Sequence, residues 1–592
     1  MRSMGKHGMS VKSFLQKLES SDKEVEANLS TMLQSVRGTK QFWFLKKSDL
    51  NCMVREWGPP TLFLTFSCAE YDSPDIRDYL HKVNDVPDTY PIGKLCTEDP
   101  VSVSRKFSKK FHDFFNLVIL KGKVLGTVTH HFWKKEYQCR GAPHYHVLLW
   151  IENAPVIGQD PNKDVLHWIQ QRITCRIPDK CSNPELHRLV TKYQQHKCSN
   201  YCKRKLKVGG VFVTRCKFGF PRHETDEAEL NPVENCLKTR NKVYNLPRSF
   251  SETRVNDYNP VLLLLWQANL DIQFISEDSL ALAQYVTGYI TKAEKSHLVD
   301  LWGEVSGKES FYSKLWSFGV RSLRSRECGM YEACDLLLGD HLYEKSETIQ
   351  WVPADMPHKR KRKLKNHSTL KKLLEDDPDS INIFNKNMID DFYLERPKEL
   401  EDLCLYDFIK WYVYSGTDSS GNRQYRKLNK PCIPNHKLYD PNKEDQWDDY
   451  YYSLLLLFVP FRAESDLLGK HKTPEQAFNE YISSGPTMEG HHEKLLKILK
   501  AQATVRKINE HRDATEELCP KTNDREEPAG LEIAGEAAVA AMNDVNEMDI
   551  CDKDDITLEE RIKMLNSDQF RIFQMVTDHH NSMNLGNVTV MI

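Results

Sequence analysis

The chain has 592 residues, of which 40% are hydrophobic and 28% are charged, and its formal net charge is −2. Because single hydrophobic cores rarely grow beyond roughly 300 residues, a chain of this length is expected to contain several domains. No apolar run approaches the length of a bilayer span, and the first residues lack the apolar stretch of a secretion signal, so the sequence argues against membrane-spanning and secreted classes. In the intracellular protein that this predicts, the 16 cysteines favour metal ligation or free thiols over disulfides.

The order of elements predicts an α+β fold in the first half of the chain. Residues 1–60 are expected to form a helical lead-in that ends at the sequence Gly58-Pro59-Pro60, where a helix cannot continue. The next domain, residues 61–300, begins with a β-branched and aromatic strand over 61–66 and continues with a helix over 101–120. Further strands are predicted over 124–131, 147–151, 260–266 and 270–275.

Beyond residue 300 the sequence predicts structural segments but no catalytic or metal-binding residues. Residues 301–510 are expected to form a mostly helical or irregular joining region, which packs as a unit on the preceding domain through aromatic-rich segments at 390–414 and 446–468. Residues 511–557 are predicted to be an acidic, disordered linker, since 15 acidic and three basic residues lie between 514 and 560. A short helix is predicted at the start of the last segment, 558–592.

Two histidines lie one residue apart at the start of an apolar, strand-like run. Residues two apart in a strand point to the same face, so His144 and His146 can present two imidazoles to one metal ion. A third ligand is expected from the adjoining strand, with Glu136 preferred and Gln138 in reserve, because a turn before Pro143 folds that strand back beside the histidines. Imidazole with carboxylate and water suits magnesium or manganese. A chance His-x-His pattern in a strand is the alternative.

A second constellation lies far downstream, in the sequence Tyr285-Val-Thr-Gly-Tyr-Ile-Thr-Lys292. The helix that carries it is expected to begin after Ser276 or Ser279, either of which can cap it. At helical spacing Tyr285, Tyr289 and Lys292 share one stripe. That stripe is offset from an apolar one made by Leu282, Val286 and Ile290. Tyrosine becomes a nucleophile when a metal or a cation stabilises its phenolate. Taken alone, paired tyrosines are more often core or surface residues.

A cysteine- and lysine-rich insert spans about 172–222. It contains a Cys-x3-Cys pair with a neighbouring histidine and a later cysteine, a set that can bind zinc tetrahedrally. The four expected ligands are His196, Cys198, Cys202 and Cys216. Because the insert has little apolar core of its own, a structural zinc ion is expected to stabilise it. Inert cysteines that behave as small apolar residues are the alternative.

Positive charge is concentrated in the same insert, where residues 171–222 carry 13 Lys or Arg and two acidic residues. Such a concentration predicts contact with a polyanion. The residues expected to bind DNA phosphates are Lys203, Arg204, Lys205 and Lys207, with a solvated charged face as the alternative. A second basic run, His358 to Lys365, has the composition of a nuclear localisation signal and predicts a nuclear location. The alternatives are a plain basic loop and a cytoplasmic location.

Three motifs together resemble those of Helitron transposases. They are Phe63-Leu-Thr-Phe-Ser67, Arg140-Gly-Ala-Pro-His-Tyr-His-Val-Leu-Leu149 and Tyr285-Val-Thr-Gly-Tyr-Ile-Thr-Lys292. The resemblance covers roughly residues 30–300 and points to the replication-initiator (Rep, or HUH) endonuclease domain, which implies an antiparallel sheet flanked by helices. It further implies that the histidine pair holds a divalent ion and that one tyrosine attacks single-stranded DNA to leave a 5′-phosphotyrosine link. The second tyrosine then accepts a strand, and Lys292 is expected to stabilise the developing negative charge.

Later segments resemble the region that joins this nuclease to a Pif-type helicase in Helitron proteins. They are Leu454 to Arg462, Glu464 to Leu468, and Leu565 to Phe570, which looks like the opening glutamine motif of the helicase. The sequence contains no Gly-x4-Gly-Lys-Ser/Thr phosphate loop, so we expect neither ATPase nor helicase activity from it. The prediction is a rolling-circle transposase fragment, truncated at the start of its helicase domain, with a helicase supplied in trans. The alternatives are a transposon-derived, non-catalytic DNA-binding protein and, third, a helicase-family protein that lacks its motor domain.

Overall fold

The computed structural model describes residues 2–3, 37, 40–137, 143–198, 202–208, 211–216, 218–239, 242–291, 328–360, 362–363, 365, 367–419, 421, 423–482 and 486–517. All of them belong to the first of the two compact units into which the chain divides, Met1–Glu536 and Ala537–Ile592. Lys292, Gln138 and the predicted helix at the start of 558–592 lie outside the described residues, as do most of 1–39 and of the predicted linker. Within the described ranges no helix has the length and apolarity needed to cross a membrane.

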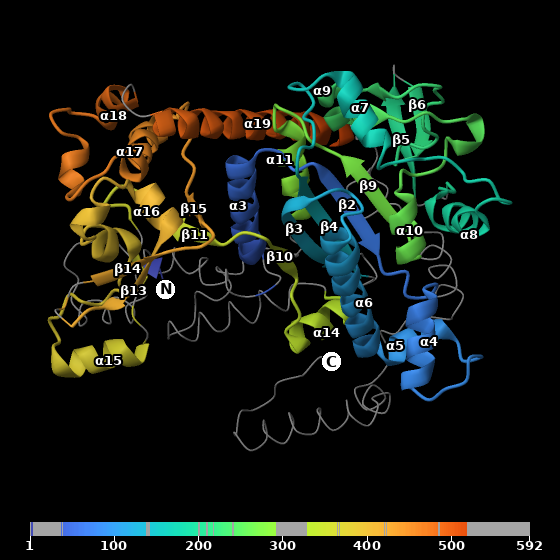
Figure 1. Ribbon diagram of the computed structural model, residues 1–592, viewed down its shortest axis with the longest axis horizontal. Helices are drawn as coiled ribbons and strands as arrows, with labels where there is room; N and C mark the ends of the chain where they lie inside the picture. Colours follow the sequence, from blue (N-terminus) through green and yellow to red (C-terminus); the bar gives the residue numbers. More distant parts are fainter. Residues whose placement is uncertain are drawn as a thin grey trace. The chain divides into compact units, whose positions relative to one another are not determined.

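A five-stranded antiparallel sheet forms the centre of this unit (Figure 1). Its strand order is β10-β3-β4-β2-β9. The strands are β2 (Leu62–Ser67), β3 (Val128–Tyr137), β4 (Pro143–Ile151), β9 (Leu270–Phe274) and β10 (Tyr343–Lys345). The mixed class with an antiparallel sheet is therefore confirmed, although β3 lies further along the chain than the predicted strand over 124–131. Strand β10 comes from beyond residue 300, and the sequence analysis did not anticipate that it joins this sheet.

Helices and two-stranded sheets complete the unit. The helices are α3 (Lys40–Trp57), α4 (Pro74–Val83), α5 (Ile92–Glu98), α6 (Pro100–Phe114), α7 (Asn162–Gln170), α8 (Pro184–Leu189), α9 (Val233–Thr239), α10 (Pro260–Trp266), α11 (Ala281–Ile290), α14 (Met330–Leu338), α15 (His367–Asp376), α16 (Leu405–Trp411), α17 (Trp447–Phe458), α18 (Pro474–Ile482) and α19 (Pro486–Glu517). Two-stranded pairs join β1 (Arg2–Ser3) to β12 (Arg362–Lys363), β5 (Lys203–Val208) to β6 (Val211–Cys216), β7 (Glu229–Leu230) to β8 (Tyr244–Asn245), β11 (Ile349–Val352) to β15 (Ile433–His436) and β13 (Tyr412–Thr417) to β14 (Arg423–Lys427).

Residues 260–266 form a helix, α10, and the predicted strand at this place is wrong. The side chain of Asn259 accepts a hydrogen bond from the backbone N–H of Leu262, and Pro260 occupies the first turn, where its missing N–H costs nothing. The helix ends at Gln267, whose φ of 55° is left-handed. A short run of leucines does not distinguish a strand from a buried helix, so the Asn-Pro start signal should have decided the assignment.

Helices cover both faces of the sheet, and strand alternation decides which side chains meet which helices. On one face Tyr145, Val147 and Leu149 of β4 pack in a cluster with Phe107 and Phe111 of α6. On the other face, Leu148 and Trp150 of β4 pack in a cluster with residues of α3 and α11. Since alternate residues of a strand share a face, the histidines of β4 point toward the side that α3 and α11 cover.

A second core lies further along the chain and is built from α16, α17, α18 and the segments between them. The aromatic-rich segments at 390–414 and 446–468 contribute many of its buried residues, among them Tyr393, Phe408 and Tyr450. Residues of β15 and α19 also enter the cluster that α3 and α11 form against the sheet: Ile433, Ile498 and Ala501. Helix α19 continues to Glu517, so the first residues of the predicted linker are helical.

Two residues of the basic run at 358–365 form ion pairs. Lys359 lies 2.7 Å from Asp449, and Arg360, which is only 2% exposed, lies 2.6 Å from Glu464. These pairs tie the run to the second core. A nuclear location remains a prediction from composition alone.

Glu70, which follows β2, is a buried carboxyl group with a strongly shifted pKa. Burial raises its pKa from 4.5 to about 7. A folded-state pKa above the unfolded value means that the contribution of this group to stability is greatest below pH 4.5 and falls as the pH rises through 7. We expect Glu70→Gln to raise the free energy of unfolding by roughly 3 kcal/mol at pH 8 and by less than roughly 1 kcal/mol at pH 5. Urea unfolding at both pH values measures this, and an equal effect at both would contradict it.

Candidate functional site

Glu136, His144 and His146 converge where β3 and β4 pair. The ladder places Glu136 directly opposite His144. The Nε2 atoms of His144 and His146 lie 3.0 Å apart, and a carboxylate oxygen of Glu136 lies 3.3 Å from Nε2 of His146. One ligand atom of each residue lies within 4.8 Å of the other two, so the group can hold a metal ion. We call these three residues the sheet cluster.

The sheet cluster has a supporting layer that the sequence analysis missed. The Thr65 hydroxyl on β2 lies 3.0 Å from Nδ1 of His146, so Nε2 of that ring is left to face Glu136. On β3, Lys134 donates a hydrogen bond of 3.3 Å to the Glu136 carboxylate. Both residues lie opposite His146 in the sheet. For Lys134 the signal was available, because Lys134 has the strand parity of Glu136, whereas only the order of strands in the sheet places Thr65 beside His146.

The environment keeps Glu136 ionised. Burial acts to raise its pKa, but the charge of Lys134 and the hydrogen bond and charge of His146 act the other way, and the pKa falls from 4.5 to about 2. His146 is fully buried and His144 is 2% exposed. A carboxylate beside two imidazoles, enclosed by protein, is a donor set that suits a divalent ion.

The tyrosine pair lies on α11, which packs over the same face of the sheet. The ring of Tyr289 meets the ring of His146 edge to face, with centroids 5.3 Å apart and an interplanar angle of 71°. Tyr289 is 7% exposed, whereas Tyr285 is partly buried at the margin of the same apolar cluster. Val286 and Ile290 belong to that cluster too, so both the tyrosine stripe and the apolar stripe contribute to it. The short helix packs among the sheet, α3 and α19, where it buries more than one stripe.

The start of α11 also differs from the prediction. The helix begins at Ala281, and Leu280, whose φ is 61°, occupies the position before it that was expected for a serine. Ser279 still satisfies part of the helix start, because its hydroxyl accepts a hydrogen bond of 3.3 Å from the N–H of Ala281, and the Glu277 carboxylate accepts one of 2.9 Å from the N–H of Leu282. A carboxylate at this end also complements the helix dipole.

A second group of possible ligands lies in the insert. Ligand atoms of His196, Cys198, Cys202 and Cys216 all lie within 4.8 Å of one another. The β5–β6 hairpin brings two of them together, because Cys202 directly precedes β5 and Cys216 ends β6 opposite Lys203. We call these four residues the hairpin cluster. It could hold a metal such as zinc, as the spacing predicted.

Aromatic side chains pack around the hairpin cluster, and neighbouring arginines affect the pKa of its histidine. Phe218 and Phe220 pack around Cys202, and the ring of Phe220 stacks on His196 with centroids 4.7 Å apart. Burial, together with the charges of Arg254 and Arg222, lowers the pKa of His196 from 6.5 to about 4. The imidazole is therefore neutral at pH 7, the form in which histidine binds a metal.

The four basic residues predicted to bind DNA all lie on β5, immediately after Cys202. Lys203 is exposed. The side chains of Arg204, Lys205 and Lys207 lie outside what the structure describes. Their role in binding DNA stays a prediction.

Comparison with known proteins places one part of this site in a family. Residues 3–149 match the family model described as the Helitron helicase-like domain at N-terminus. The matched segment contains β2, β3 and most of β4, and with them Thr65 and the whole sheet cluster, but it ends before the insert and α11. No curated protein matches the chain.

Proposed function

Because residues 3–149 are a Helitron-related transposase region, we propose that the chain is a metal-dependent endonuclease and strand transferase of the rolling-circle (HUH, or Rep) class that acts on single-stranded DNA. The observation that carries the proposal is the sheet cluster with Tyr289 against it. A metal-binding set next to a phenol supplies the two things that phosphodiester cleavage needs: an electrophilic activator and a nucleophile.

The reaction that we propose balances as a transesterification. Glu136, His144 and His146 would hold a magnesium or manganese ion, which would polarise the scissile phosphate. The oxygen of a tyrosine attacks phosphorus, its proton leaves to water, and the bond from phosphorus to the 3′-oxygen breaks. The leaving oxygen takes up a proton to become a 3′-hydroxyl, and the 5′-phosphate stays on the tyrosine. Lys292 is proposed to stabilise the negative charge that develops.

Geometry favours Tyr289 as the first nucleophile. Its ring contacts His146, while Tyr285 lies one helical turn earlier and is only partly buried. Tyr285 is then left to accept a strand in the second step. The substrate is proposed to be single-stranded, because a strand must thread past both the ion and the phenol and cannot do so while paired. Basic residues of β5 are proposed to add phosphate contacts.

The hairpin cluster is proposed to hold one structural zinc ion. We expect metal analysis of the purified protein to find one zinc per chain and Cys202→Ser to lose it, because Cys202 is buried among the other three ligands. Cys181→Ser is the matched control, since Cys181 is an exposed thiol of the same insert outside the hairpin cluster. Equal zinc content in the Cys202→Ser variant and the wild type would contradict the proposal.

The main rival is a transposon-derived DNA-binding protein without turnover. Incubation of labelled single-stranded oligonucleotides of random sequence with manganese separates the two. We expect nicked products that disappear on chelation of the metal. DNA binding that persists without any cleavage would favour the rival. The third alternative is a helicase-family protein, and the sequence argues against it because it contains no phosphate loop. ATPase activity above background would support this alternative.

A further inference from the structure

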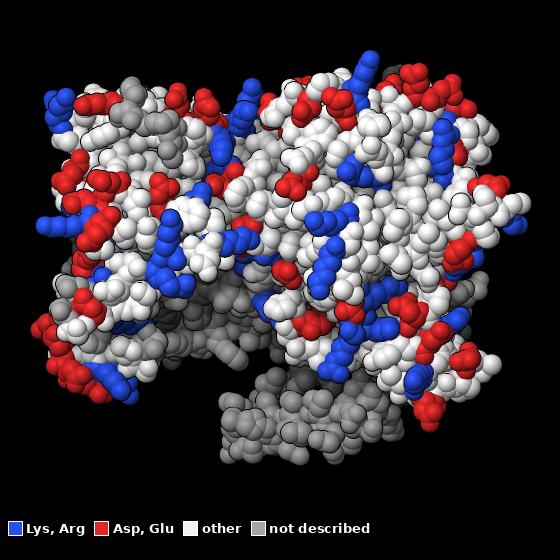
Figure 2. Space-filling view, in the orientation of Figure 1, with Lys and Arg blue, Asp and Glu red and all other residues white. Residues whose placement is uncertain are grey.

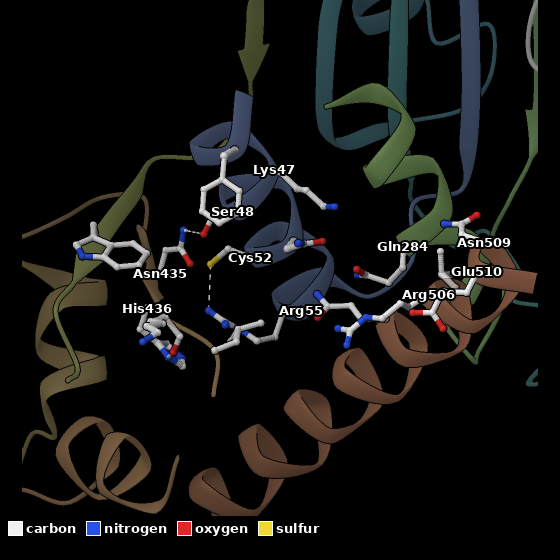
Figure 3. Close-up of a pocket in the computed structure, with 17 residues that line it drawn as sticks. Lys47, Ser48, Cys52, Arg55, Gln284, Asn435, His436, Arg506, Asn509 and Glu510 are labelled. Carbon is white, nitrogen blue, oxygen red and sulfur yellow. Dashed lines mark hydrogen bonds between the residues drawn. The ribbon is translucent and has the colours of Figure 1, made fainter. Parts of the chain in front are cut away.

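A cavity of about 610 Å³ lies between α3, α11, β15 and α19, apart from both metal-binding clusters (Figure 3). Residues from all four elements line it, together with Trp351 of β11. Two contacts fix its wall: Asn435 donates a hydrogen bond of 3.1 Å to the Ser48 hydroxyl, and Arg55 donates one of 3.2 Å to the backbone oxygen of Pro434. We call this space the α3–α19 cavity.

The charge that lines the α3–α19 cavity is predominantly positive. Four cations line it, Lys47, Arg55, Lys437 and Arg506, and Glu510 is the acidic residue among the lining side chains. The nearby carboxylates of α3 are engaged elsewhere, since Asp49 pairs with Lys345 at 2.6 Å and Glu56 with Lys410 at 2.8 Å. By contrast, Lys and Arg are interspersed with Asp and Glu over the face that Figure 2 shows. The cavity is thus a local concentration of positive charge on a mixed surface.

Two buried amide atoms in the cavity lining have no hydrogen-bond partner among the residues that the structure describes. They are Nε2 of Gln284 and Oδ1 of Asn51. Gln284 is 5% exposed, and Figure 3 shows its side chain pointing from α11 toward Arg55. Buried polar atoms are nearly always paired, so unpaired ones in a cationic cavity indicate a polar ligand. Arg55, itself 6% exposed, supplies a charged donor at the same wall.

Aromatic surface is available at the same place. Phe44 is 70% exposed, and Trp351 also lines the cavity. Cations that track a phosphate backbone, combined with aromatic rings on which bases stack, are the combination by which proteins bind single strands without reading sequence. A single small anion would require the cations but not the exposed rings.

The cavity borders the helix that carries both tyrosines. Gln284 directly precedes Tyr285 on α11, and Nζ of Lys47 lies 3.8 Å from the position that a Cβ on Gly288 would take. Gly288 in turn directly precedes Tyr289. The cavity therefore borders the same helix at which the proposed function holds a strand.

We propose that the α3–α19 cavity binds the sugar-phosphate backbone of the single strand that flanks the scissile phosphate. This rests on the proposed function, because that function supplies the strand. Lys47, Arg55, Lys437 and Arg506 contact phosphates, Gln284 donates a hydrogen bond, and Phe44 stacks a base. The cavity is a binding subsite that positions DNA and takes no part in bond cleavage.

The test compares two double variants. Lys437→Ala/Arg506→Ala removes two exposed cations of the cavity, and Lys443→Ala/Lys507→Ala removes two exposed cations of neighbouring positions that do not line it. Fluorescence anisotropy measures the binding of random single-stranded oligonucleotides of about 8 and about 30 nucleotides over a range of salt concentrations. For the longer strand we expect the slope of log K against log salt to become shallower by about 1.4 in the cavity variant, roughly 0.7 for each lost phosphate contact.

The control variant is expected to retain the wild-type slope for both strands. Equal slopes in the cavity and control variants would overturn the proposal, and so would saturable displacement of the longer strand by inorganic phosphate at constant ionic strength. Because binding is measured without cleavage, failure of this subsite and failure of the nuclease are distinguishable. Gln284→Leu provides a second variant, because it introduces no cavity at the helix interface. We expect it to weaken the binding of the longer strand more than the binding of the shorter one.

Discussion

Replacing His146 with alanine is expected to reduce metal-dependent cleavage of single-stranded DNA by at least about 10³-fold. His146 is fully buried and lies at the centre of the sheet cluster, in contact with His144, Glu136 and Tyr289. Its loss removes one of three ligands from the ion that polarises the phosphate, a contribution of several kcal/mol, and each 1.4 kcal/mol is roughly tenfold in rate. Single-turnover cleavage of a labelled strand in manganese measures the effect.

Two further variants test whether the loss of cleavage is specific to the metal site. His131→Ala alters a histidine of the neighbouring strand β3 that lies against Phe115 on the opposite face, and we expect its cleavage rate to stay near wild type. Thr65→Val removes the partner of His146 Nδ1 and should weaken metal affinity by about 10- to 100-fold. A His146→Ala protein that is folded and cleaves within a few fold of wild type would exclude the sheet cluster as the metal site.

Asp335→Ala is expected to lower the free energy of unfolding by about 3–5 kcal/mol. Asp335 on α14 and Lys135 on β3 form an ion pair of 2.5 Å in which both side chains are fully buried. Ser104 and Tyr137 also donate hydrogen bonds to Asp335. The substitution would leave the Lys135 ammonium group buried without its counter-charge, which is why the cost is large. Urea unfolding followed by circular dichroism measures the change.

An exposed ion pair on another helix, α6, provides the control. Lys109 and Asp113 on α6 lie 2.8 Å apart, with side chains that are 74% and 55% exposed. Asp113→Ala should therefore change the free energy of unfolding by less than about 1 kcal/mol. Replacing Lys135 by Met together with Asp335 by Leu should recover part of the loss, because no charge is then left buried. Equal effects of Asp335→Ala and Asp113→Ala would show that α14 does not pack on the sheet as described.

Strand parity predicted the sheet cluster because it depends only on local geometry. Once Glu136 and His144 are recognised as belonging to adjacent antiparallel strands, a short turn fixes their pairing, and the structure has that pairing. The ligand spacing of the hairpin cluster is equally local. Thr65 was missed because it comes from a strand 81 residues away, and only the sheet order places it beside His146.

Other features could not be derived from one sequence. The edge strand β10 has only three residues, and its pairing with β3 depends on tertiary packing across about two hundred residues of chain. Helix α10, by contrast, could have been predicted, because the Asn259-Pro260 start signal distinguishes its apolar run from a strand. The α3–α19 cavity combines side chains from five elements that are remote in sequence, so no local sequence pattern predicts it.

The most direct test of a tyrosine endonuclease is a search for a covalent bond between protein and DNA. The purified protein is incubated with labelled single-stranded DNA and manganese, separated under denaturing conditions and digested, and the labelled peptide is identified by mass spectrometry. We expect DNA on a peptide that contains Tyr285 and Tyr289, retained in Tyr285→Phe and lost in Tyr289→Phe and His146→Ala. Adduct that survives replacement of both tyrosines, or no adduct while DNA binding is retained, would contradict a tyrosine endonuclease.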